Sequence, residues 1–228
     1  MIIQIYAIVS KEDAESLCKL GTDHIGLVVS RNGDSDKGIV SVKTAKEIID
    51  VIKDYGKIAT IITDTSSPDG IKKYVEELHP DIIHICNELS DAELSSLNEM
   101  LSDSGVQLMY AVPVKDRSSI DVALNVQRYA DFLMLDSPFR SNQMPGFVGA
   151  TGKTHDWNIS AEIVSLSYKP VILGGGLSPE NVQDAIRKVR PAGVDAKTSL
   201  DIPGGKGRKD IEKVKEFIRK VRELEKET

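Results

Sequence analysis

Cysteine is scarce in this chain of 228 residues: it contains only Cys18 and Cys86, and their separation does not match the spacing of metal ligands. Two such cysteines suit the reducing cytoplasm, where we expect the protein to work without a metal or a cofactor. No apolar run reaches the length of about 20 residues that spans a membrane. The first ten residues lack a basic segment and a cleavage site, so they predict a strand rather than a signal peptide.

Excess positive charge is also missing, because the formal net charge is -6. This balance argues against a nucleic-acid or anionic-membrane partner. Aromatic residues are few, at 5%, but the apolar content of 40% is ordinary and predicts a core of full size. No linker, low-complexity tract or shift in composition divides the chain. We therefore expect one domain over residues 1–228, as a monomer or a homodimer.

Apolar runs alternate with helical patterns along the whole chain. The runs predict strands at 2–9, 24–29, 57–62, 81–85, 106–111, 131–135, 171–173 and 193–196. The helical patterns cover 11–20, 41–55, 68–78, 90–102, 118–129, 160–166, the residues after Ser178, and 209–226. Strands joined by connections of this length are parallel, and eight such units predict a (β/α)8 TIM barrel of the α/β class. A doubly wound open sheet is the alternative.

A glycine-rich turn follows the seventh predicted strand. The sequence V-I-L-G-G-G-L-S-P-E-N-V at residues 171–182 joins a buried strand to three glycines and then to a helix start, with Ser178 as the N-cap and Pro179 in the first helical position. Such a turn presents backbone N–H groups beside the positive end of a helix, which suits phosphate. The simpler interpretation is a turn that needs glycine only for its backbone angles. In a TIM barrel the phosphate site follows strands seven and eight, which favours a phosphorylated small-molecule partner.

Strand periodicity predicts which side chains point into the barrel at its carboxyl end. They are Gln4 and Tyr6, His84 and Cys86, Met134 and Asp136, and Asp195 and Lys197. A lysine that points inward needs an anionic partner, and Asp195 is the candidate. Asp136 can serve as a general acid if burial raises its pKa, and Cys86 near His84 can form a thiolate. Structural alternatives are a turn cap for Asp136, a core histidine for His84 and a small buried side chain for Cys86.

The C-terminal half resembles the phosphoribosylanthranilate isomerase family of tryptophan biosynthesis. G-A-T-G-K-T-H-D-W at 149–157 is similar to its lid motif, residues 171–182 to its phosphate loop, and G-V-D-A-K-T-S-L-D at 193–201 to its second phosphate segment. The resemblance implies phosphate binding around Gly175, Gly176, Thr198 and Ser199. It also implies that Asp136 is the general acid.

The N-terminal half departs from that family's pattern. Where the family has K-I-C-G with a cysteine base, this chain has Q-I-Y-A, so Tyr6 occupies the base position. Tyr6 has a reference pKa of about 10 and is a poor base, which leaves Cys86 as the other candidate. Lys37 is the nearest candidate for the family's carboxylate-binding arginine. Asp195, Lys197 and Gly152, the last in the long loop that follows the sixth strand, complete the predicted substrate contacts.

Three functions remain open at this point. The first is an aldose–ketose isomerase that performs the Amadori rearrangement of phosphoribosylanthranilate or a close relative. The second is a diverged phosphosugar isomerase, epimerase or lyase in which Lys197 takes part. The third is a barrel that binds a phosphorylated metabolite without catalysis.

Overall fold

The computed structural model describes residues 1–33, 38–138 and 154–226. In this part of the chain, the strands are β1 (Ile2–Ile5), β2 (His24–Ser30), β3 (Ile39–Ser41), β4 (Ile58–Thr63), β5 (Ile82–Ile85), β6 (Gln107–Pro113), β7 (Phe132–Asp136), β8 (Val171–Leu173) and β9 (Gly193–Ala196). The α-helices are α1 (Lys11–Leu20), α2 (Val42–Asp54), α3 (Pro68–Leu78), α4 (Asp91–Ser104), α5 (Ser118–Val126), α6 (Trp157–Leu166), α7 (Val182–Val189) and α8 (Ile211–Glu225).

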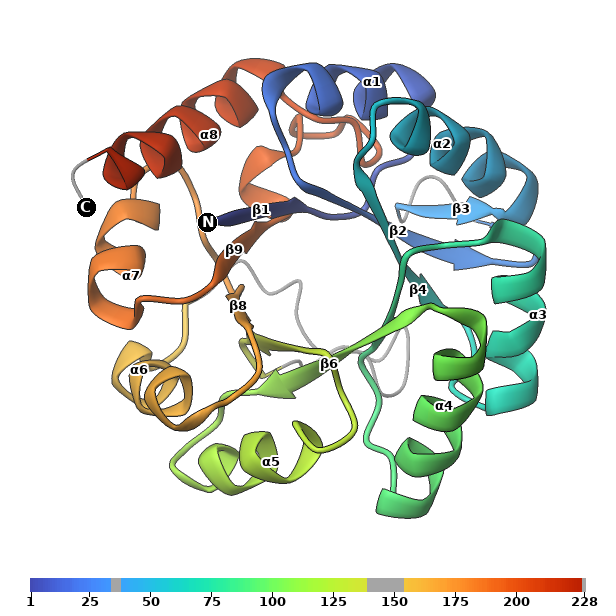
Figure 1. Cartoon of the computed structure of the whole chain (residues 1–228). Coiled ribbons are helices and arrows are strands. Elements are labelled where there is room, and N and C mark those ends of the chain that lie inside the picture. The colour runs from blue at the N-terminus through green and yellow to red at the C-terminus, as the bar shows by residue number, and fades with distance from the viewer. Residues whose placement is uncertain (34–37, 139–153, 227–228) are drawn as a thin grey trace.

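The strands form a closed parallel barrel. Their order is β1-β9-β8-β7-β6-β5-β4-β2-β3, and pairing of β1 with β2 closes the ring. Figure 1 shows the helices wrapped around this ring. The predicted TIM barrel is thus confirmed, and the closing pair excludes an open, doubly wound sheet. The sequence analysis missed β3, a short strand in register with the end of β2, with Ile39 opposite Val28.

Alternating side chains divide the core into an outer and an inner part. Ile3 and Ile5 of β1 belong to the large cluster between the barrel and the helices. Inside the barrel, one layer consists of Ile82, Met109, Met134 and Ile172. The layer at the carboxyl ends of the strands consists of Tyr6, Ala7, Val28, Ile62, Cys86 and Ala111. This second layer is the apolar floor on which the candidate site is built.

Most helix boundaries follow local capping signals. Ser90 and Glu93 form a capping box at the start of α4, and Gly105 ends that helix in the left-handed conformation. Several predicted boundaries were wrong by three or more residues, and two of them lie near the barrel mouth. β1 ends at Ile5 rather than at residue 9. The strand cannot continue because Ala7 has a φ of 60°, which an extended strand does not accept. α6 begins at Trp157 rather than at residue 160, because Asp156 caps it.

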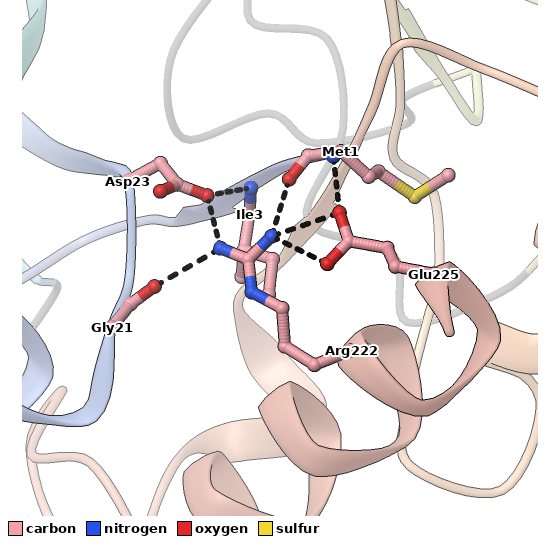
Figure 2. A network of polar contacts seen from close by, with 6 residues as sticks. All are labelled: Met1, Ile3, Gly21, Asp23, Arg222 and Glu225. Atoms are coloured by element: carbon pink, nitrogen blue, oxygen red, sulfur yellow. Dashed lines mark hydrogen bonds and ion pairs between the residues drawn. The ribbon is translucent and has the colours of Figure 1, made fainter.

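The last helix returns to the start of the barrel. Arg222 of α8 donates hydrogen bonds to the carbonyl oxygens of Met1 and Gly21, and its guanidinium pairs with Asp23 at 2.6 Å (Figure 2). The amino group of Met1 pairs with Glu225. This network ties together both ends of the described chain and the start of β2. Among the described residues there is no helix with the length and apolar character needed to cross a membrane.

Candidate active site

A cavity of about 680 Å³ opens at the carboxyl ends of β7, β8 and β9. It is lined by Asp136, Thr154, Gly175, Gly176, Leu177, Ser178, Asn181, Asp195, Ala196, Lys197, Thr198 and Ser199. The four residues predicted to bind phosphate therefore share one cavity. Ser199 Oγ donates a hydrogen bond of 2.5 Å to the carbonyl of Leu177, which joins the loop after β9 to the loop after β8.

The glycine turn after β8 leaves no room for a side chain. Gly175 and Gly176 have φ values of 78° and 67°, which other residues rarely adopt. A Cβ on Gly175 would lie 2.6 Å from Ser137 Oγ and 2.7 Å from His155 Nδ1. The turn therefore needs glycine for contact as well as for its backbone angles.

The helix after this turn begins later than predicted. α7 starts at Val182 with Asn181 in the N-cap position. Ser178 nevertheless caps the turn that leads into α7, because its Oγ accepts a hydrogen bond from Glu180 N at 3.2 Å and its carbonyl accepts one from Val182 N at 3.0 Å. The side chain of Asn181 accepts a hydrogen bond from Ser178 N at 2.8 Å and donates one to the carbonyl of Gly176 at 3.0 Å. Asn181 thus fastens the turn instead of capping α7 with its side chain.

A second cavity, of about 80 Å³, lies deeper in the barrel mouth. Its lining is Tyr6, Ala7, Val28, Ile62, His84, Cys86, Met134, Asp136, Asp195 and Lys197. The structure thus brings together nearly all the side chains predicted to point inward. Asp136, Asp195 and Lys197 line both cavities, and they form the boundary between a polar compartment and an apolar one.

Asp136 ends β7 at this boundary. Burial raises the pKa of its carboxyl to about 7, although Ser137 N donates a hydrogen bond of 2.6 Å to the carboxylate and opposes the shift. A group with this pKa carries its proton in a large fraction of molecules at neutral pH. It can therefore act as a general acid there.

Asp195 of β9 faces the same boundary and is only 6% exposed. Burial, followed by the nearby charge of Asp136, raises the pKa of Asp195 to about 8. Gln4 opposes the shift by donating a hydrogen bond of 3.2 Å to Asp195 Oδ1, and the charge of Lys209 opposes it as well. Two acidic side chains with raised pKa values thus line one cavity, a pattern typical of catalytic sites.

Lys197 does not take Asp195 as its partner, and that prediction was wrong. Lys197 Nζ lies 3.2 Å from a carboxylate oxygen of Asp201, which also pairs with Lys209. Lys209 has a fully buried side chain, and burial lowers its pKa. Because one carboxylate serves two lysines, this trio carries a net positive charge when all three groups are ionised, and Lys197 lines the same cavity as Gly175 and Gly176.

Comparisons with known proteins show the family. A sequence model described as "N-(5'phosphoribosyl)anthranilate (PRA) isomerase" matches residues 3–220. The chain belongs to the phosphoribosylanthranilate isomerase family. Among its relatives, N-(5'-phosphoribosyl)anthranilate isomerase of Methanothrix thermoacetophila is 30% identical over 96% of this chain and 97% of its own. Isomerase 1 of Methanosarcina mazei is 31% identical over 96% and 94%.

Solved structures of the family share the fold. The isomerase of Thermotoga maritima superposes with a TM-score of 0.81 at 24% identity, covering 98% of this chain and 100% of the other. The isomerase of Pyrococcus furiosus gives a TM-score of 0.76 at 25% identity, covering 98% and 99%.

Tyr6, which the resemblance placed at the position of the family's cysteine, is accommodated by its neighbours. A Cβ on Gly26 of β2 would lie 2.4–2.5 Å from atoms of the Tyr6 ring, so the absence of a side chain at Gly26 makes the space for this ring. The Tyr6 hydroxyl lies 2.8 Å from His84 Nδ1. Burial, with smaller contributions from Cys86 and Asp195, raises the pKa of Tyr6 well above its ordinary value, and burial lowers the pKa of His84 to about 3.

Cys86 lies one residue beyond β5 and is 5% exposed. Cys18 and Cys86 are both thiols, not a disulfide. The sequence analysis proposed that His84 activates Cys86. An imidazole with a pKa of about 3 is neutral at pH 7, so it does not supply the positive charge that would stabilise a thiolate.

Sequence reasoning missed several residues that hold the site together. His155 Nε2 lies 2.7 Å from Ser160 Oγ and its Nδ1 lies 3.3 Å from Ser137 Oγ. These hydrogen bonds hold the ring against the turn at Gly175. The position of His155 in T-H-D-W, at the end of the segment that resembles the lid motif, was the signal that could have identified it. Lys37 and Gly152, two predicted substrate contacts, lie outside the described residues.

Proposed function

We propose that this protein is a phosphoribosylanthranilate isomerase, an aldose–ketose isomerase of tryptophan biosynthesis. One observation carries the proposal: a carboxyl group that is protonatable near pH 7, Asp136, lies where the phosphate cavity meets the apolar inner cavity. A phosphorylated ribose bound in the outer cavity would place its ring near Asp136. The family match over residues 3–220 supports the same reaction.

The residues have separate roles in this proposal. The N–H groups of Gly175 and Gly176, with Thr198 and Ser199, bind the substrate phosphate. Lys197 adds positive charge beside it, and Asp136 gives a proton to the ring oxygen of the ribose. Lys37 and Gly152 stay proposed substrate contacts.

The same proposal includes the setting of the enzyme. We place it in the cytoplasm, which the two thiol cysteines support, and expect a monomer or a homodimer. The related isomerase of Thermotoga maritima is described as dimeric, in a solved structure of monomers generated from it.

A lyase that uses Lys197 as a Schiff base is less well supported. Its ammonium lies 3.2 Å from the Asp201 carboxylate, an environment that suits a charged group, whereas a Schiff base forms from the neutral amine.

The test is an assay of the purified wild-type protein with phosphoribosylanthranilate. We expect conversion to 1-(o-carboxyphenylamino)-1-deoxyribulose 5-phosphate, the compound whose reduced form a related isomerase binds in a solved structure. Binding of phosphate to the protein without any conversion of this substrate would contradict the proposal and favour a binding protein.

A further inference from the structure

The base of the reaction is not at the strand-one position in this chain. The Tyr6 hydroxyl is buried and paired with His84 Nδ1 at 2.8 Å. Because burial raises the pKa of Tyr6 and lowers that of His84 to about 3, neither the phenolate nor the imidazolium forms readily at neutral pH. The pair is therefore a neutral hydrogen-bonded contact, and it leaves the removal of a substrate proton to another group.

We propose that Asp195 is the general base of this isomerase and that it works with Asp136 as a carboxyl pair holding one proton. The inference rests on the proposed function. It moves the base from the first strand of the barrel to the neighbouring last strand.

The position of Asp195 suits this role. In the β1–β9 ladder Asp195 lies opposite Gln4, two residues before Tyr6, so it is on the side of the barrel where the family has its cysteine. Asp195 lines both cavities together with Asp136. The strand between them, β8, is followed by Gly174, and a Cβ there would lie 3.6 Å from Asp195 Oδ2 and 2.7 Å from Met134 Cε. The bare Gly174 thus leaves space between the two acidic strand ends.

Gln4 can serve Asp195 in both protonation states. Its side chain is fully buried, and its Nε2 donates to Asp195 Oδ1 at 3.2 Å. Gln4 Oε1 is buried and has no hydrogen-bond partner in the structure. If the amide rotates by half a turn, Oε1 can accept a hydrogen bond from a protonated Asp195. An amide is suited to a carboxyl group that gains and loses a proton in each turnover, so Gln4 is a positioning residue.

The charges around the pair favour a shared proton. The groups that act on Asp195 are Asp136 on β7, Gln4 on β1 and the buried Lys209 after β9, and Asp195 in turn acts on Tyr6. Burial raises the pKa of both carboxyl groups, and the charge of Asp136 raises that of Asp195 further, so the two groups do not readily ionise together. At neutral pH the pair therefore holds one proton, and catalysis uses the molecules in which Asp136 carries it.

The proton balance of the rearrangement fits such a pair. Asp136 gives its proton to the ribose ring oxygen as the bond from that oxygen to C1′ breaks, and the nitrogen lone pair forms a C1′=N double bond. Asp195 then takes the proton from C2′. The C2′–H electrons form a C1′=C2′ double bond, and the C=N electrons return to nitrogen, which gives the enolamine. The proton count of the pair is one before and after, with the proton moved from Asp136 to Asp195. The enolamine becomes the ketose when its 2′-hydroxyl loses a proton and C1′ gains one.

The first test compares Asp195→Asn with wild type, using phosphoribosylanthranilate as substrate. Asparagine keeps an oxygen that can accept the hydrogen bond from Gln4, so we expect the fold and the phosphate-induced rise in Tm to remain. The kcat should fall by about 10²–10⁴-fold with KM changed only a few-fold. The matched control is Asp184→Asn on the exposed side of α7, which should retain wild-type kcat.

Two further measurements separate a base from a structural residue. A substrate deuterated at C2′ should show a larger kinetic isotope effect in Asp195→Asn than in wild type, because proton removal becomes slower. Added formate should restore part of the activity of Asp195→Ala, since it can occupy the space of the missing carboxylate beside the inner cavity.

The outcomes are distinguishable. A wild-type protein that does not convert the substrate overturns the proposed function, and the base assignment with it. An active wild type with an equally active Asp195→Asn overturns the base assignment alone. A slow Asp195→Asn without the isotope effect and without formate rescue also overturns it, as does a loss of turnover seen in Cys86→Ser but not in Asp195→Asn.

Discussion

At the scale of single residues, burial sets the pKa values of the side chains at the barrel mouth. Asp136 and Asp195 are acidic side chains of ordinary type, and removal from water raises the pKa of each because it disfavours the charged form. The same effect lowers the pKa of His84. Sequence periodicity predicted that these residues point inward, but the pKa values depend on how completely the neighbouring strands enclose them.

Asp136 determines the alkaline side of the pH profile. As a general acid it must carry a proton, and the proton that it shares with Asp195 is lost as the pH rises through the higher of the two pKa values, about 8. We expect kcat to fall about tenfold per pH unit well above that pKa. Asp136→Asn should lower kcat by about 10²–10⁴-fold, and its residual activity should lose the alkaline limb. A variant that keeps both the wild-type rate and this limb would leave Asp136 as a turn cap.

Gly26 and Tyr6 form a coupled pair. Gly26→Ala would place a Cβ 2.4 Å from the Tyr6 ring, so the ring must move and its contact with His84 must weaken. We expect a loss of about 1–3 kcal/mol in the free energy of unfolding, measured with urea. In a Tyr6→Cys background the smaller side chain removes the clash, and Gly26→Ala should cost less than about 1 kcal/mol. Equal costs in the two backgrounds would show that the pair is not coupled.

At the scale of elements, the glycine turn after β8, where we propose that phosphate binds, is held by three strand ends and one helix start. Gly175 follows β8, Ser137 follows β7, His155 precedes α6, and Ser199 from the loop after β9 bonds to Leu177. The sequence predicted where the turn is but not these supports, because they come from segments that are distant in the sequence.

Gly175→Ala should therefore abolish phosphate binding. Its Cβ would collide with Ser137 and His155, whereas a Cβ on Gly204, which also has a positive φ, meets no atom within 4 Å. Both substitutions carry a backbone strain of about 1–2 kcal/mol, so Gly204→Ala is the matched control. Phosphate should raise the Tm of wild type and of Gly204→Ala but not of Gly175→Ala. If phosphate stabilises all three alike, the anion binds elsewhere.

At the scale of the whole molecule, a closed barrel depends on the join between its first and last elements. The β1–β2 and β1–β9 ladders close the ring, and the network in Figure 2 fastens α8 to the amino terminus. Arg222 contacts four residues there, of which Met1, Gly21 and Asp23 are about 200 positions away in the sequence.

Arg222→Ala should lower stability more than an equivalent change elsewhere on α8. It removes partly buried hydrogen bonds to charged and carbonyl groups, and we expect a loss of about 1.5–3 kcal/mol. Arg219→Ala is the matched control, since Arg219 is exposed and pairs only with Glu216 and Glu223 of the same helix in the described contacts. It should cost less than about 1 kcal/mol. Equal losses in the free energy of unfolding, measured with urea, would show that the contacts between α8 and the amino terminus add no extra stability.

The amino-acid sequence by itself determined the barrel and the place of the glycine turn after β8. Both are local signals: the alternation of apolar runs with helical patterns, and three glycines directly after a buried strand. Only the tertiary structure decided that Lys197 pairs with Asp201, that β3 joins the sheet, and that Asp195 and Asp136 line the same two cavities. The placing of Asp136 and Asp195 on the same two cavities depends on barrel closure, which encloses both carboxyl groups away from water. Lys197 and Asp201 are only four residues apart, but their pairing depends on how the segment after β9 folds beside Lys209, and hydrophobic periodicity does not encode that.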